Sequence, residues 1–171
     1  MSRVLLKLSG ESFANPDTNF GIQPDIIERI ASEITHANKE GIEIGVVVGG
    51  GNFFRGVQES AQNMAQANAD YMGMLGTVIN SLALQSNLEK IGVPSRVMTA
   101  LSINRVAEPY IKNKASRHLE KNRVVIFASG TGNPFFSKKI ANVSHKKEGG
   151  EQIWRLSKNW TYFFTHLWPL F

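Results

Sequence analysis

The chain has 171 residues, of which 42% are hydrophobic and 19% charged, and this composition is typical of a globular protein with a buried core. It has no cysteine and no apolar run as long as a membrane span, which excludes disulfides and a cysteine nucleophile and leads us to expect a cytoplasmic chain. The net charge of +5 does not indicate a nucleic-acid partner, because six basic and two acidic residues after position 136 account for +4.

The first third of the chain predicts a strand, a loop, a helix and a second strand. Residues 4–8 form an apolar strand interrupted by Lys7, a side chain that either reaches solvent or meets an anion. Residues 13–23 contain Asn, Pro and Gly and predict a surface loop. Pro24 opens a helix with isoleucines at helical spacing. The β-branched residues 42–48 predict the second strand.

The second strand ends in a glycine-rich segment, residues 49–55, which we call the first glycine loop. Three consecutive glycines lack the Cβ atoms that would keep a ligand away, and Arg55 adds a permanently charged side chain that suits phosphate. This pattern favours a phosphate-binding loop. The alternative is a glycine-rich turn followed by a surface arginine.

A long helix is predicted for residues 66–91, and it ends at Gly92 and Pro94. Asp70 lies near its start, where a carboxylate either stabilises the helix dipole or accepts a hydrogen bond from a substrate. The helix carries an apolar stripe that we expect to be buried. Its members are Leu75, Val78, Ile79, Leu82, Leu88 and Ile91.

The remaining pattern continues the alternation of strands and helices. Residues 93–99 predict a strand, Pro109 begins a helix, and residues 123–128 predict a further strand. That strand runs into residues 130–136, which we call the second glycine loop. The alternation predicts an α/β fold with a mostly parallel sheet and helices on both faces. In such a sheet Lys7 and both glycine loops converge on one edge.

Several known site types are absent from the sequence. Neither glycine loop has the spacing of a Walker A motif or a Rossmann fingerprint, and no serine elbow or metal-ligand spacing is present. His36 and His118 are predicted to be solvated or capping residues. Phosphoryl transfer remains possible, because it requires positioning and charge compensation and no nucleophilic side chain.

Four blocks of sequence together resemble bacterial uridylate kinases of the amino acid kinase family. They are KLSGE at 7–11, GGGNFFRG at 49–56, ADYMGML at 69–75 and GTGNPFF at 130–136. The resemblance extends from residue 3 to residue 136, and the last block disfavours an aspartokinase-like or carbamate kinase-like relative. The resemblance implies a three-layer αβα fold and a cytoplasmic homohexamer. It also implies ATP-dependent phosphorylation of UMP to UDP, with Mg²⁺ accompanying ATP.

The resemblance also implies a role for individual residues. Lys7 would stabilise the charge on the transferred group. The residues that would touch the phosphates of ATP are Lys7, Leu8, Ser9, Gly10, Gly51 and Arg55. The residues that would hold UMP are Gly50, Asp70, Thr131, Gly132, Asn133, Pro134, Phe135 and Phe136.

The resemblance stops at residue 137, where the family continues into two threonines and an aspartate. This chain has Ser137, Lys138 and Lys139, followed by a basic and aromatic tail with all three tryptophans. We therefore expect an acceptor and phosphate-binding part at residues 1–136 of a C-terminally truncated domain, and a divergent tail at residues 137–171.

A reading-frame change near codon 137 would explain the tail, which has no predicted fold beyond some helix at residues 151–160. Binding to a membrane surface or to nucleic acid is the alternative for the tail. The truncation leaves two hypotheses, a UMP kinase and a catalytically inactive UMP-binding fragment or regulatory module.

Overall fold

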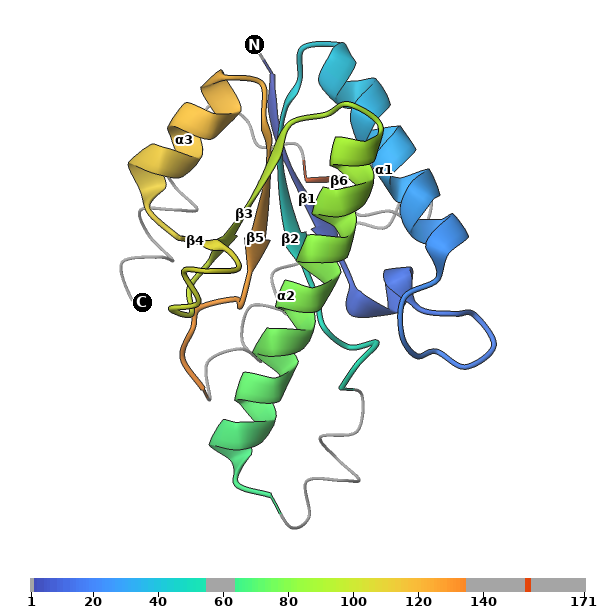
Figure 1. The fold of residues 1–171 in the computed structure, drawn as a ribbon, viewed down its shortest axis with the longest axis vertical. Coiled ribbons are helices and arrows are strands. Elements are labelled where there is room, and N and C mark those ends of the chain that lie inside the picture. The colour runs from blue at the N-terminus through green and yellow to red at the C-terminus, as the bar shows by residue number, and fades with distance from the viewer. Residues whose placement is uncertain (1, 55–63, 135–152, 155–171) are drawn as a thin grey trace.

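The structure is a computed structural model that describes residues 2–54, 64–134 and 153–154, and a sheet lies at its centre (Figure 1). The strands are β1 (Arg3–Leu8), β2 (Glu43–Val48), β3 (Ser95–Thr99), β4 (Glu108–Pro109), β5 (Val124–Ala128) and β6 (Ile153–Trp154). Their order is β4-β3-β5-β2-β1-β6. Neighbouring strands pair in parallel except β6, which runs antiparallel to β1. The predicted mostly parallel sheet is confirmed.

Helices cover both faces of this sheet. Figure 1 shows α1 (Pro24–Lys39) and α2 (Gln66–Lys90) on one side and α3 (Lys112–Glu120) on the other. A short 3-10 helix, η1 (Gly10–Phe13), follows β1. The predicted starts of α1 and α2 are confirmed, as is the three-layer arrangement. No helix in the described ranges has the length and apolar character needed to cross a bilayer.

Two hydrophobic clusters join these layers, because side chains along a strand alternate between the faces of a sheet. Val124 and Ile126 of β5 belong to the cluster that includes α1 and α2, while Val125 and Phe127 belong to the cluster that includes α3. Leu84 of α2 is fully buried in the first cluster. Burying a side chain of this kind stabilises the fold by about 2 kcal/mol. The two clusters therefore fix the strands whose carboxyl ends form one edge of the sheet.

The apolar stripe predicted on α2 is only partly buried. Val78 and Leu88 lie in the core, whereas Leu75, Ile79 and Ile91 are 46%, 47% and 44% exposed. The reason is that the middle of α2 turns its small and polar residues inward, against the backbone of the loops that follow the strands. Apolar periodicity does not reveal such a contact, since the inward side carries few apolar side chains.

Two further predictions are wrong in detail. The loop expected at residues 13–23 is not all at the surface, because Phe13 and Ala14 are buried. Pro109 does not open α3, which begins at Lys112. Pro109 instead lies in β4 opposite Thr99, at the end of the strand order where its missing N–H leaves no ladder bond unmade.

The helix predicted for residues 151–160 is contradicted at two positions. Residues 153 and 154 form β6, which pairs with Leu6 and Leu5 of β1. The other residues of that prediction, like the rest of the tail after residue 134, lie outside the described residues.

Candidate functional site

The carboxyl ends of three neighbouring parallel strands lie side by side and form the candidate site. Lys7 of β1 pairs with Val47 of β2, which in turn pairs with Phe127 of β5. Open α/β sheets bind their ligands at this edge. Lys7 is half-buried, and no acidic partner for it lies within the part of the chain that the structure describes. As predicted, Lys7 and the starts of both glycine loops converge there.

The glycines of the first glycine loop make room for other parts of the protein backbone. A Cβ atom on Gly49 would lie 2.7 Å from the amide nitrogen of Gly10, and one on Gly50 would lie 2.5 Å from the carbonyl oxygen of Gly73. A Cβ atom on Gly10 would lie 2.2 Å from the amide nitrogen of Gly51. Close packing of loop against loop and of loop against α2 therefore explains these glycines without a ligand.

Two buried asparagines fix the first glycine loop in place. The side-chain amides of Asn52 and Asn80 bind each other reciprocally, at 2.9 and 2.7 Å. Each amide also donates to a backbone carbonyl, Asn80 to Gly49 at 2.8 Å and Asn52 to Gly21 at 2.7 Å. Both side chains are almost fully buried, and both amides have partners. Sequence reasoning did not single out Asn80, because a polar residue within a helix is usually exposed.

The second glycine loop begins in a strained conformation. Ser129, just before the loop, has a φ of +65°, and Gly130 and Gly132 follow at +51° and +75°. A left-handed conformation costs a non-glycine residue about 1–2 kcal/mol. Two hydroxyl groups hold Ser129: its amide donates to the Thr77 hydroxyl at 2.7 Å, and its own hydroxyl lies 2.7 Å from that of Thr99. The sequence gives no signal for these contacts, which join residues far apart in the chain.

A small cleft of about 210 Å³ opens between the second glycine loop and the segment after β3. Thr131 lines it together with Ala100, Leu101 and Tyr110. The Thr131 hydroxyl accepts a hydrogen bond from the Asn133 amide at 3.2 Å, which shapes the turn. The cleft therefore places Thr131, a residue predicted to bind UMP, beside a concave surface.

Asp70 lies in the second turn of α2, one turn before Gly73, which contacts Gly50. Its carboxylate accepts a hydrogen bond from the Gln66 amide at 2.8 Å. The helix position is therefore the one predicted. Figure 1 shows that the N-terminal part of α2, the part whose sequence includes Asp70, extends past the sheet edge.

Three of the predicted site residues, Arg55, Phe135 and Phe136, lie outside the described residues. Ser9, another predicted residue, lies directly after β1, with its hydroxyl 3.0 Å from that of Ser12. In the described parts of the chain no three His, Asp or Glu side chains are grouped closely enough to hold a metal ion.

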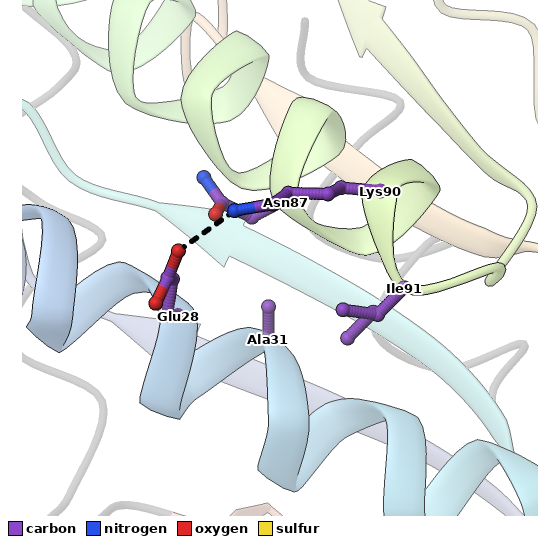
Figure 2. A pocket seen from close by; sticks show the side chains of 5 residues that line it. All are labelled: Glu28, Ala31, Asn87, Lys90 and Ile91. Carbon is purple, nitrogen blue, oxygen red and sulfur yellow. Dashed lines mark hydrogen bonds and ion pairs between the residues drawn. The ribbon is translucent and has the colours of Figure 1, made fainter.

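A second hollow, of about 190 Å³, lies between α1 and α2 (Figure 2). Glu28 and Lys90 form an ion pair across it at 2.9 Å, and Ala31 and Ile91 complete its apolar side. None of the predicted site residues lines this hollow. We therefore assign it to helix packing.

A charged cluster next to the cleft surrounds Glu108 of β4. Its carboxylate lies 2.6 Å from the Lys114 ammonium and 3.2 Å from Nε2 of His118. Partial burial raises the pKa of Glu108, but the hydrogen bonds from Lys114 and His118 outweigh it and leave the pKa below its ordinary value. His118 is buried and also contacts Arg123 at 3.1 Å, so its prediction as a solvated or capping residue is wrong. Burial likewise raises the pKa of Tyr110.

Comparison with known proteins identifies relatives of this chain. It is 56% identical over 135 residues to the uridylate kinase of Roseobacter denitrificans, covering 79% of this chain and 55% of that protein. It is 48% identical over 157 residues to the uridylate kinase of Pediococcus pentosaceus, covering 92% of this chain and 65% of that protein. The UMP kinase structure from Bacillus anthracis matches with a TM-score of 0.73 and 43% identity, covering 78% of this chain and 55% of that chain.

The resemblance found in the sequence is thus confirmed, although the chain spans only about 55–65% of the length of these relatives. The profile of the family described as "Amino acid kinase family" matches residues 2–144, which include the parallel strands β1 to β5, the helices and both glycine loops. On this match, the chain belongs to the amino acid kinase family.

Proposed function

We propose that the described residues form the acceptor part of a nucleoside monophosphate kinase, which transfers the γ-phosphoryl group of ATP to UMP. The observation that carries the proposal is Lys7, which is half-buried without an acidic partner among the described residues and lies at the sheet edge beside the first glycine loop. A half-buried cation without a carboxylate beside it is suited to binding an anion. The similarity to uridylate kinases supports UMP as the acceptor of the transferred phosphoryl group.

In this reaction a phosphate oxygen of UMP attacks the γ-phosphorus of ATP. The bond between that phosphorus and the oxygen of the β-phosphate breaks, which yields UDP and ADP. Lys7 would offset the negative charge on the transferred group, and Leu8, Ser9, Gly10, Gly51 and Arg55 would contact the phosphates of ATP. Mg²⁺ would arrive with ATP as part of the donor.

UMP would occupy the space between α2 and the second glycine loop. Asp70 would accept a hydrogen bond from the nucleotide, and Gly50 would approach it with its backbone. The remaining contacts would come from the second glycine loop at residues 131–136. Thr131 also lines the cleft between this loop and the segment after β3, which supports contacts from the loop, since nucleotide sites are concave and carry a few polar groups.

We also propose that the chain works in the cytoplasm as a homo-oligomer, a hexamer by its resemblance to the uridylate kinases. The exposed apolar face of α2 supports self-association. Tyr71, Met72, Leu75 and Ile79 lie on adjacent turns of one side of the helix and are 40–47% exposed. Apolar patches of this kind are typical of protein interfaces.

A second function is a UMP-binding fragment without kinase activity. One observation favours it. Ser137, Lys138 and Lys139 stand where the resemblance leads us to expect two threonines and an aspartate, so the expected carboxylate is replaced by a cation. Such a fragment would bind UMP at the acceptor site without transferring the phosphoryl group.

Calorimetric titration with UMP and with Mg-ATP, followed by an assay of UDP formation, tests both functions. For the kinase we expect binding of both nucleotides, and a Lys7→Ala variant should form UDP about 100-fold more slowly. Lys39→Ala, a change at an exposed lysine of α1, is the control and should have no effect. Binding of UMP alone would favour the fragment. Failure to bind either nucleotide would refute both functions.

A further inference from the structure

We propose that Thr77 is a positioning residue, which fixes the start of the second glycine loop on α2 next to the first glycine loop. The inference deepens the proposed function, because it concerns how the acceptor site is aligned. It rests on the bond from the Ser129 amide to the Thr77 hydroxyl, at 2.7 Å. Neither residue was predicted to touch a substrate, so Thr77 acts only through Ser129.

The direction of each hydrogen bond at Thr77 is fixed by chemistry. An amide N–H can only donate, so the Thr77 oxygen must accept from Ser129. The hydroxyl proton of Thr77 is then available for the carbonyl oxygen of Met74, at 2.6 Å. Both bonds therefore depend on one hydroxyl group in one rotamer.

Ser129 needs such a support, because its φ of +65° is unfavourable for a serine. Residues in strained conformations persist only where their surroundings hold them, and Ser129 is held by the hydroxyls of Thr77 and Thr99. It is fully buried. The path of the second glycine loop thus begins from a residue that α2 and β3 hold in place.

The same side of α2 also holds the first glycine loop. Gly73, Thr77 and Asn80 follow one another at the spacing of one helix face. Gly73 and Thr77 contact the backbone of Gly50, and Asn80 binds the carbonyl of Gly49 at 2.8 Å. One helix face is therefore the common support of both loops, and Thr77 is its contact to the second.

Thr77→Val tests the proposal, because valine keeps the shape of threonine and removes the hydroxyl. Thr77→Ser retains the hydroxyl and should restore the bond. Thr35→Val is a matched control, since the buried Thr35 of α1 also donates its hydroxyl to a carbonyl oxygen of its own helix, at 2.7 Å, and has no hydrogen bond to the described residues of either loop. The full chain is used throughout, and Thr77→Ala serves as a second variant if the valine form does not fold.

Two readouts follow. In Thr77→Val the Ser129 amide should exchange with solvent about tenfold faster by NMR, and the dissociation constant for UMP should rise about tenfold. Thr77→Ser and Thr35→Val should match the wild type in both. Unchanged exchange at Ser129 would overturn the proposal, and so would faster exchange with unchanged UMP affinity. If the wild type does not bind UMP, the proposed function fails, while the exchange rate of Ser129 still decides whether Thr77 holds the loop.

Discussion

Gly50→Ala is expected to lower the free energy of unfolding by about 2 kcal/mol, because a methyl group has no room between the first glycine loop and α2. The added Cβ atom would lie 2.5 Å from the carbonyl oxygen of Gly73 and 2.9 Å from the amide nitrogen of Thr77. Ordinary contacts to carbon require about 3.5 Å, so the loop would have to move by roughly 1 Å. Both obstructing atoms belong to the backbone of a long helix, which cannot yield as a flexible side chain would.

Gly73→Ala is the control for this prediction. Gly73 lies in the same contact, but its own Cβ atom would meet no heavy atom within 4 Å. Alanine is the better helix former by about 1 kcal/mol, so this variant should be more stable than the wild type. Urea unfolding followed by far-UV circular dichroism measures both values. A Gly50→Ala protein as stable as the wild type would refute the packing argument, as would equal destabilisation by the two variants.

Three further predictions follow from the structure. Asn80→Ala should lower the free energy of unfolding in urea by about 3 kcal/mol, because it leaves Asn52 without its buried partner. Asn52→Ala should then lower it less in the Asn80→Ala background than in the wild type. Because the pKa of Glu108 is lowered from 4.5, its contribution to stability is present above pH 4.5 and lost as the pH falls through the lowered pKa. The stability gap between wild type and Glu108→Gln should therefore narrow on acidification, and a constant gap would contradict this. Leu75→Glu should reduce the oligomer mass measured by light scattering, whereas unchanged mass would exclude the apolar face of α2 from the interface.

Much of the fold could be predicted because its signals are local. The β-branched run at residues 42–48, Pro24 at a helix start and the glycine loops after strands each report on their immediate neighbours in the chain. The alternation of strands and helices then led to the parallel sheet and to Lys7 at its ligand-binding edge. The burial of Phe13 has no local signal, because turn residues dominate the sequence around this one aromatic side chain that packs inward.

The contacts that align the candidate site could not be predicted in the same way. Thr77 and Asn80 lie in a helix whose inward side is polar at this point, so apolar periodicity assigns that side to solvent. Their partners are 52 and 31 residues away, in loops whose path depends on the assembled sheet. Likewise the buried His118 meets Glu108, which β4 brings beside it, and the sequence gives no signal for that pairing. The glycines did signal a close approach, but the sequence could not show that the approaching group is the protein's own backbone.

The long sequence separation of these loop contacts has a consequence for folding. Bonds between residues 28 to 52 apart close large loops of chain, and closing such loops costs entropy. The parallel pairing of β1 with β2 joins Arg3 to Glu43, so the sheet and the loop contacts carry entropic costs of the same kind. The hydrogen bonds of α1 are local and carry no such cost, so a chain with much of its helix content can still lack an aligned pair of loops.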